Sequence, residues 1–265
     1  VRQGAAIETI GLGEYRRPHG SVFLPDGKTL LVTAERNRAL VLVDVSRAEV
    51  RGAIATDQEG SHMVVAAPAA HLAFVANIRS GSVSVLDLAT SKRVATVPTG
   101  AGAEGIDISP DEKEVWVANR ADNTLSVLEV ASLRVVKVLP CRSFPIRVRF
   151  TPDGKYVLVS NARSGDVAVF DRKARTEVRR IVMAARAAED KRERLFSDRF
   201  GDSPVPVGIL IDPESEYAYV ANTNADVIAV IDLREWAVVD RLKAGREPDG
   251  LGYSPLEINP HAGKR

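Results

Sequence analysis

Residues 103–141 read AEGIDISPDEKEVWVANRADNTLSVLEVASLRVVKVLPC, and this stretch decides the fold. Apolar and polar residues alternate over four runs, 103–109, 114–118, 124–130 and 133–139, with short segments rich in Pro, Asp, Asn and Ser between them. Period-two alternation over runs of this length predicts β-strands, and the short separators predict tight turns. The stretch is therefore predicted to form a four-stranded antiparallel meander.

The same unit recurs along the chain of 265 residues. A proline marks the first turn of each copy, at Pro25, Pro68, Pro110, Pro152, Pro213 and Pro255. Consecutive prolines are 42 or 43 residues apart, except for 61 residues between the fourth and fifth. An acidic residue follows each of the first five prolines by nineteen positions, and an asparagine follows four of them by nine. A four-stranded unit at this period is typical of a propeller blade, because radial stacking buries both faces of every sheet.

Five units are complete, and they begin near residues 18, 61, 103, 145 and 206. Residues 5–11 match only a fourth strand, and residues 248–254 match only a first strand. We therefore expect one all-β propeller domain over residues 1–265, with five complete blades and partial terminal blades. A seven-bladed ring, completed by an N-terminal segment of the intact protein, is the main expectation. A six-bladed ring is the alternative.

A family resemblance rests on short motifs inside the repeats. The sequences FVAN at 74–77, WVAN at 116–119, LVSN at 158–161 and YVAN at 219–222 resemble the Tyr-Val-Thr-Asn repeat of YVTN-family β-propellers, and the first repeat departs from it because VTA at 32–34 lacks the Asn. This family is similar to surface-layer propellers and to the haem d1 domain of cytochrome cd1. The resemblance implies a periplasmic or extracellular location, and its motifs specify fold rather than activity. We expect the repeated Asn and Asp to hydrogen-bond the backbone of nearby turns.

Composition excludes several classes of partner. Lys and Arg total 36, Asp and Glu total 35, and no long charge run occurs, so neither nucleic acid nor an anionic membrane is expected as the main partner. No apolar run approaches the roughly 20 residues that a membrane-spanning helix needs. The lone Cys141 cannot form an internal disulfide and is expected to be a small buried residue. The oligomeric state is left open.

The 61-residue spacing indicates an insertion of 19 residues within about 183–204. Its first half is rich in Ala, Arg, Glu and Lys, which favours a short helix, and its second half is expected to be a loop. Long loops on a rigid scaffold often carry binding, so the insertion is a candidate lid or partner-docking element. Its candidate residues are Phe196 and Phe200 as anchors, and Asp198, Arg199 and Asp202 as polar contacts. A solvated flap without function is the alternative.

The position six residues before each proline is predicted to enter the innermost strand at the mouth of the axis. Its occupants are His19, His62, Glu104, Ile146, Val207 and Asp249, and the next position holds Gly20, Met63, Gly105, Arg147, Gly208 and Gly250. The predicted ligand-binding residues of this mouth are His19, His62, Glu104, Arg147 and Asp249. Imidazole and carboxylate groups suit a transition metal or general acid–base chemistry, and Arg147 suits a carboxylate or phosphate. The candidate metal set is His19, His62, Glu104 and Asp249, whereas a solvated mouth without a ligand is the alternative.

Three functions remain open from the sequence. The first is a non-catalytic exported protein that binds a small molecule or a protein at the mouth. The second is a metal- or haem-dependent enzyme, similar to lactonase or reductase propellers, that uses the His, Glu and Asp ring. The third is a surface-layer scaffold. Neither the ligand nor the cofactor can be named from these residues.

Overall fold

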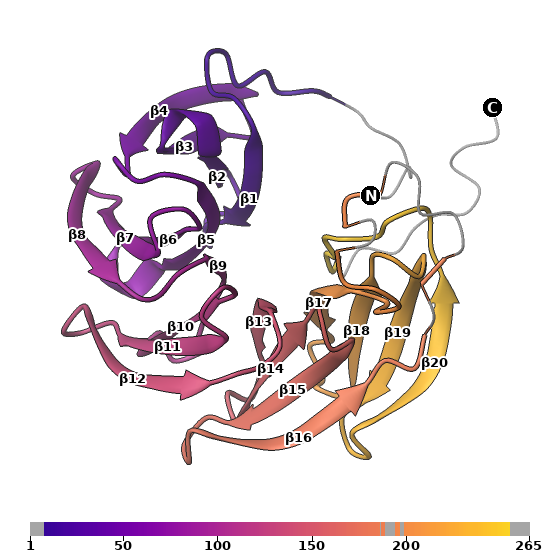
Figure 1. The fold of residues 1–265 in the computed structure, drawn as a ribbon. Coiled ribbons are helices and arrows are strands. Elements are labelled where there is room, and N and C mark those ends of the chain that lie inside the picture. The colour runs from indigo at the N-terminus through magenta and orange to yellow at the C-terminus, as the bar shows by residue number, and fades with distance from the viewer. Residues whose placement is uncertain (1–7, 186, 189–193, 197–198, 255–265) are drawn as a thin grey trace, which may run out of the picture.

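The computed structural model describes residues 8–185, 187–188, 194–196 and 199–254. Twenty strands in this part of the chain form five four-stranded antiparallel sheets, and in each sheet the strands follow one another in sequence order. Figure 1 shows the sheets side by side in an arc, with the first strand of each on the inside and the fourth on the outside. The predicted all-β propeller with five complete blades is confirmed.

The strands of blades 1 and 2 are β1 (Pro18–Phe23), β2 (Thr29–Ala34), β3 (Ala39–Asp44), β4 (Glu49–Ala55), β5 (Ser61–Ala67), β6 (Leu72–Asn77), β7 (Ser82–Asp87) and β8 (Lys92–Pro98). Those of blades 3 and 4 are β9 (Ala103–Ile108), β10 (Glu114–Asn119), β11 (Thr124–Glu129), β12 (Arg134–Pro140), β13 (Pro145–Phe150), β14 (Tyr156–Asn161), β15 (Asp166–Asp171) and β16 (Thr176–Val182). Blade 5 contains β17 (Pro206–Ile211), β18 (Tyr217–Asn222), β19 (Val227–Asp232) and β20 (Ala237–Lys243). The 3-10 turns η1 (Glu35–Asn37) and η2 (Pro68–Ala70) lie in blades 1 and 2. Each blade begins at the predicted residue.

The partial terminal strands differ from the expectation. Residues 248–254 do not form a strand, and neither do residues 8–11, while residues 5–7 lie outside the described part of the chain. The described part of the insertion is loop, including residues 184–185 and 187–188 in the half expected to favour a helix, and residues 186 and 189–193 lie outside the described part. No helix among the described residues is long and apolar enough to cross a membrane.

The repeated polar residues act in two ways, one of which differs from the prediction. Asp87 and Asp232 accept hydrogen bonds from backbone N–H groups two and three residues further on, as predicted for the acid that ends a third strand. The buried asparagines instead bond mainly across to the third strand: Asn77 donates to Ser84 Oγ at 3.0 Å, and Asn119 donates to Ser126 Oγ at 2.9 Å. An asparagine side chain can reach this far because it stands at the end of the second strand, opposite the start of the third. Asn77 and Asn119 therefore tie strands together, whereas Asn222 donates to Val220 O of its own strand.

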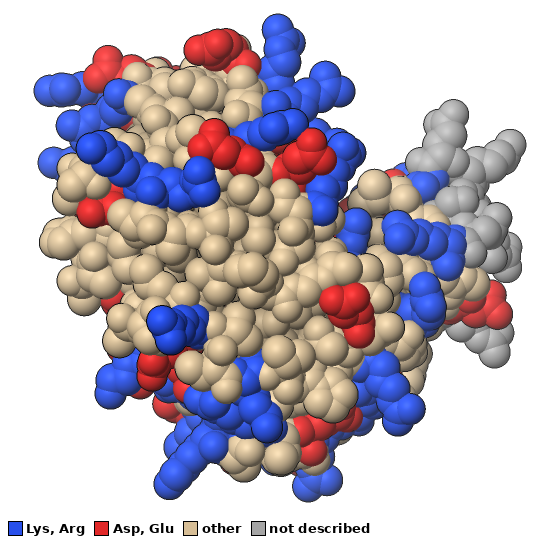
Figure 2. All heavy atoms as spheres, turned by 60° about the vertical axis from the view of Figure 1, so that its left-hand side comes forward, with Lys and Arg blue, Asp and Glu red and all other residues tan. Residues whose placement is uncertain are grey.

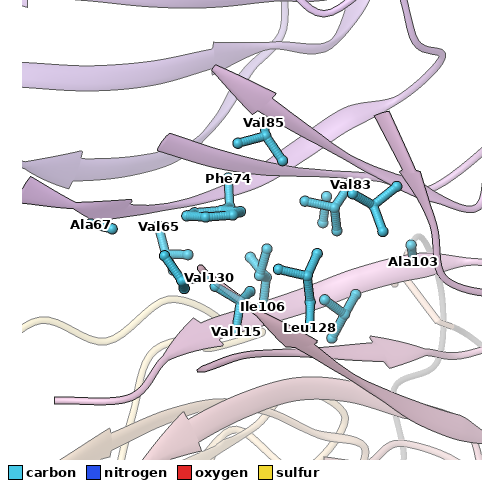
Figure 3. Packing of buried hydrophobic residues seen from close by; sticks show 13 residues of the cluster. Val65, Ala67, Phe74, Val83, Val85, Ala103, Ile106, Val115, Leu128 and Val130 are labelled. Atoms are coloured by element: carbon cyan, nitrogen blue, oxygen red, sulfur yellow. The ribbon is translucent and has the colours of Figure 1, made fainter. Parts of the chain in front are cut away.

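Apolar side chains from facing sheets form the core between blades. Figure 3 shows Phe74, Val83 and Val85 of blade 2 opposite Ile106 and Leu128 of blade 3. These side chains are almost fully buried. Burying each of them stabilises the fold by about 1.5–3 kcal/mol, so the seams between blades carry much of the stability.

Glycine allows the innermost strands to approach closely at alternate seams. A Cβ on Gly20 would lie 2.6 Å from His62 O, and a Cβ on Gly105 would lie 2.6 Å from Ile146 O. Contacts this short are forbidden to any other residue. We call these contacts glycine seams. A Cβ on Gly208 would likewise clash with Asp249 O. Residue 249 therefore occupies the place of a sixth inner strand, although it is not in a strand.

Charged side chains gather on parts of the outer surface. Figure 2 shows Lys, Arg, Asp and Glu gathered at the upper and lower edges of one flank, with a broad band of uncharged residues between them. Both signs occur at each edge, which agrees with the near-equal totals of basic and acidic residues.

Candidate functional site

The predicted mouth residues stand at the same end of neighbouring inner strands. His19, His62 and Glu104 are each the second residue of β1, β5 and β9, and Arg147 is the third residue of β13. The pairing of each inner strand with its neighbour slips at this point, which is the signature of a β-bulge. A bulge leaves one residue unpaired and re-aims its side chain, so the repeat itself directs these groups into the mouth.

Glu104 lies at the centre of the cluster and is only 4% exposed. Its carboxylate accepts hydrogen bonds from Arg120 and from Arg147 Nη1, the latter at 3.1 Å. His62 Nε2 lies 3.4 Å from Glu104 Oε1, within ion-pair range but without hydrogen-bond geometry. Burial alone would raise the pKa of Glu104, but His62, Arg147 and Arg120 outweigh it and lower the pKa to about 2. Glu104 is therefore ionised at neutral pH.

His62 bridges two carboxylates. The ring is 7% exposed, and its Nδ1 donates a hydrogen bond to Glu35 Oε1. Glu35 also forms an ion pair with Arg17, whose Nε lies 2.7 Å from Glu35 Oε2. The other ring nitrogen, Nε2, is buried and has no hydrogen-bond partner among the described residues. Glu35 thus fixes the ring orientation, and Nε2 faces Glu104 without a hydrogen bond.

His19 stacks on His62, with ring centroids 3.5 Å apart and an interplanar angle of 29°. The side chain is exposed at the surface, although the stack removes one ring face from water. Loss of hydration lowers the pKa of His19 to about 4, and the positive charges of His62 and Arg147 act in the same direction. His19 is therefore neutral at pH 7 and has a lone pair available.

Asp249 completes the group of predicted residues from the segment after β20. Its Oδ1 lies 3.5 Å from Arg147 Nη2, too poorly aligned to accept a hydrogen bond. This oxygen and His62 Nε2 are both buried polar atoms without hydrogen bonds in the described part of the chain. Most buried polar atoms in proteins have a partner, so two such atoms in one mouth indicate a place for a ligand.

The cluster does not fit a metal ion in this arrangement. Two guanidinium groups contact Glu104, and Arg147 also faces Asp249, so the carboxylates are already neutralised by cations. No group of three or more His, Cys, Asp or Glu is placed to hold a metal within the described ranges. The predicted metal set stays a prediction that these contacts disfavour, and no distance here bears on haem.

The insertion anchors beside the mouth. Phe200 is 6% exposed and packs with Phe144 in an apolar cluster, against which Phe196 is partly buried. Arg199 lies over the rings of Phe144 and Phe200. Asp202 is exposed, and Asp198 lies outside the described residues.

Three site residues are missing from the sequence-based set. Glu35 and Arg120 both occupy the position ten residues after the blade proline, one place after the position of the repeated Asn, which is Ala34 in the first repeat. Other repeats have Ile78, Ala162 and Thr223 there, so a column of mixed charge could have drawn attention to it. Arg17 precedes β1 and carries no repeat signal.

Comparison with known proteins supports a propeller relationship. The family described as lactonase, 7-bladed beta-propeller, matches residues 13–189. A putative 6-phosphogluconolactonase from Bacteroides uniformis is similar in structure, with a TM-score of 0.72 and 17% identity over 89% of this chain and 74% of that chain. Hydrazine synthase from Kuenenia stuttgartiensis has a TM-score of 0.65 and 18% identity over 93% of this chain and 92% of that chain. At these identities the two structures bear on the fold alone. No curated protein sequence matches the chain.

Proposed function

The chain belongs to the lactonase family of seven-bladed β-propellers, and from that premise we propose that it binds a small lactone at the axial mouth and hydrolyses the ring ester. One observation carries the proposal. His62 is a buried imidazole whose Nδ1 is held by Glu35 and whose Nε2 has no hydrogen bond to any described residue. An oriented histidine with one open nitrogen is the usual form of a general acid or base.

The neighbouring groups supply the remaining parts of an ester hydrolysis. Neutral His19 accepts a proton from water, whose oxygen attacks the lactone carbonyl carbon. Arg147 stabilises the negative charge that develops on the carbonyl oxygen. The ring C–O bond then breaks, and His62 Nε2 donates a proton to the departing ring oxygen. The product is a hydroxy acid, and solvent returns the proton from His19 to His62.

Glu104 has a positioning role in this scheme. It is ionised, buried and bound by Arg120 and Arg147, so it is a poor proton acceptor at neutral pH. Glu35 and Glu104 place negative charge on both sides of the His62 ring, which is complementary to an imidazolium. Glu104 therefore orients Arg147 and His62 rather than contacting the reacting atoms.

A pH-stat assay with an uncharged lactone, δ-valerolactone, tests the proposal. We expect wild-type hydrolysis above the uncatalysed rate, and losses of about 100-fold or more in kcat for His62→Ala and for His19→Ala. His71→Ala is the matched control, because His71 is an exposed histidine in the turn after η2 and its loss should leave the rate unchanged. If no lactone of four- to seven-membered ring size is hydrolysed faster than in buffer, the proposal is wrong.

The second candidate is binding without catalysis. It is favoured by the guanidinium of Arg147, which lies in the mouth between Glu104 and Asp249 and has an N–H pattern that matches a carboxylate ligand. Calorimetry with the hydroxy acid product distinguishes the two functions: binding that depends on Arg147 without any turnover supports the second. An exported location, the haem-dependent alternative and the surface-layer scaffold rest on resemblance alone and stay predictions.

A further inference from the structure

A cluster of three rings and three arginines lies beside the mouth, and we call it the Arg–Phe cluster. It contains Phe144, Phe196, Phe200, Arg120, Arg163 and Arg199. The Phe144 and Phe200 ring centroids are 4.9 Å apart, and those of Phe196 and Phe200 are 5.6 Å apart. Phe144 and Phe200 are buried among apolar residues of blades 4 and 5, so two of the three rings form a fixed platform.

Each of the three guanidinium groups lies within 6.0 Å of the centroid of Phe144, whose ring is tilted by 59° to that of Phe200. The Cζ of Arg199 lies 4.9 Å from the Phe144 centroid and 5.3 Å from that of Phe200. The Cζ of Arg163 lies 6.0 and 5.9 Å from the same two centroids, and Arg120 approaches Phe144 to 5.3 Å. Cation–π contact holds a guanidinium by its flat face and leaves its N–H edges available for hydrogen bonds.

Two of the three guanidinium groups are not paired with a carboxylate among the described residues. Arg120 shares the single carboxylate of Glu104 with Arg147. Within the described residues, Arg163 and Arg199 form no ion pair with a carboxylate, and both are exposed. Like charges that converge on one platform repel one another, and an anion between them would relieve the repulsion. Phosphate and carboxylate oxygens match the N–H pattern of paired guanidinium groups.

We propose that the Arg–Phe cluster is an oxyanion-binding subsite, in which Arg163 and Arg199 hold a phosphate or carboxylate group above Phe144 and Phe200. The insertion builds it, because Phe196, Arg199 and Phe200 all lie within the residues added between blades 4 and 5. The subsite is separate from the groups assigned to ester hydrolysis, so it stands whether or not the chain is a lactonase. Arg120 connects it to Glu104 and hence to the mouth.

Titration calorimetry with inorganic phosphate and, separately, with succinate tests the subsite at about 20 mM salt, where screening is weak. We expect saturable binding to the wild type, with affinity at least about tenfold lower for Arg163→Gln/Arg199→Gln. Arg134→Gln is the control, since Arg134 is an exposed arginine on the outer strand β12, and its affinity should stay within about twofold. The tighter of the two anions identifies the group that the subsite recognises.

A second variant examines the platform itself. Phe144→Leu keeps an apolar side chain in the cluster but removes the ring that all three arginines approach, so anion binding should weaken there too. Wild-type protein that binds neither anion, or a double variant that binds as tightly as the wild type, would overturn the subsite. Hydrolysis of uncharged δ-valerolactone should be unchanged in the double variant, which separates a failure of this subsite from a failure of the proposed reaction.

Discussion

Replacing Glu104 with Gln should reveal how strongly the mouth cluster stabilises the fold. The substitution keeps the side-chain volume but removes the one negative charge shared by Arg120, Arg147 and His62. The pKa of Glu104 falls from its ordinary value of 4.5 to about 2 in the folded protein. At about 1.4 kcal/mol per pKa unit, the folded state favours the ionised carboxylate by about 3 kcal/mol. Removing one partner of a buried ion pair costs about 3–5 kcal/mol in other proteins, which is the same magnitude.

The sign of the pH dependence follows from the lowered pKa. A carboxyl group with a depressed folded pKa stabilises the protein fully above its unfolded pKa of 4.5, and this contribution disappears as the pH falls toward 2. About 1 kcal/mol should therefore be lost between pH 7 and pH 3.5. The gap in unfolding free energy between wild type and Glu104→Gln should shrink from about 3 to about 2 kcal/mol over this range.

Urea denaturation followed by circular dichroism measures both quantities. Glu129→Gln is the matched control, because it is the same substitution in the same blade at an exposed strand end, and it should change stability by less than about 0.5 kcal/mol. The reasoning fails if Glu104→Gln costs less than about 1 kcal/mol at pH 7, or if its cost is the same at pH 3.5.

Three further predictions concern packing and reactivity. Gly105→Ala should destabilise by about 1–3 kcal/mol in urea melts because its Cβ would meet the next blade's backbone, whereas Gly52→Ala, with nothing within 4 Å, should not; equal effects would contradict the glycine seam. Phe200→Ala should lower the free energy of unfolding by about 3–5 kcal/mol and speed proteolysis of the insertion, whereas Leu195→Ala should do neither because Leu195 is 67% exposed. A Phe200→Ala variant that is as stable and as resistant to protease as the wild type would contradict the anchoring role of Phe200. Burial raises the pKa of Cys141 to about 12, so Ellman's reagent at pH 8 should label it only after unfolding; rapid native labelling would contradict its burial.

The fold could be predicted from the sequence because every level of the repeat agrees. Proline and aspartate at the turns, alternation in the strands and the 42-residue period all specify one blade, and the structure starts its blades where the period does. The prediction of strands at the two ends was wrong for the described residues, because each end carries only one of these agreeing signals. Residues 248–254 carry the spacing of an inner strand, but no strand pairs with them in the described part of the chain, and hydrogen bonding to a neighbouring strand is what makes a strand.

The site could be predicted only as far as the repeat sets its geometry. The bulge at the start of each inner strand directs His19, His62 and Glu104 into one cluster, and alignment on the prolines is sufficient to find them. What the alignment does not reveal is which charges neutralise one another. Arg120 comes from the end of a second strand, and Glu35 from η1, so their contacts depend on loop conformations that no period encodes. Among the predicted metal ligands, Glu104 is therefore paired with Arg120, which does not lie on an inner strand and is not found by aligning those strands.

The alternation of glycine at the hub has a mechanical consequence. Where glycine faces the next blade, the backbones of the two inner strands are in contact, so the distance between these blades can hardly decrease. The intervening seams pass through Met63 and Arg147, whose flexible side chains can change rotamer. Any widening or narrowing of the arc should therefore be concentrated at these two seams. Blades joined by a glycine seam should then move together as one rigid body.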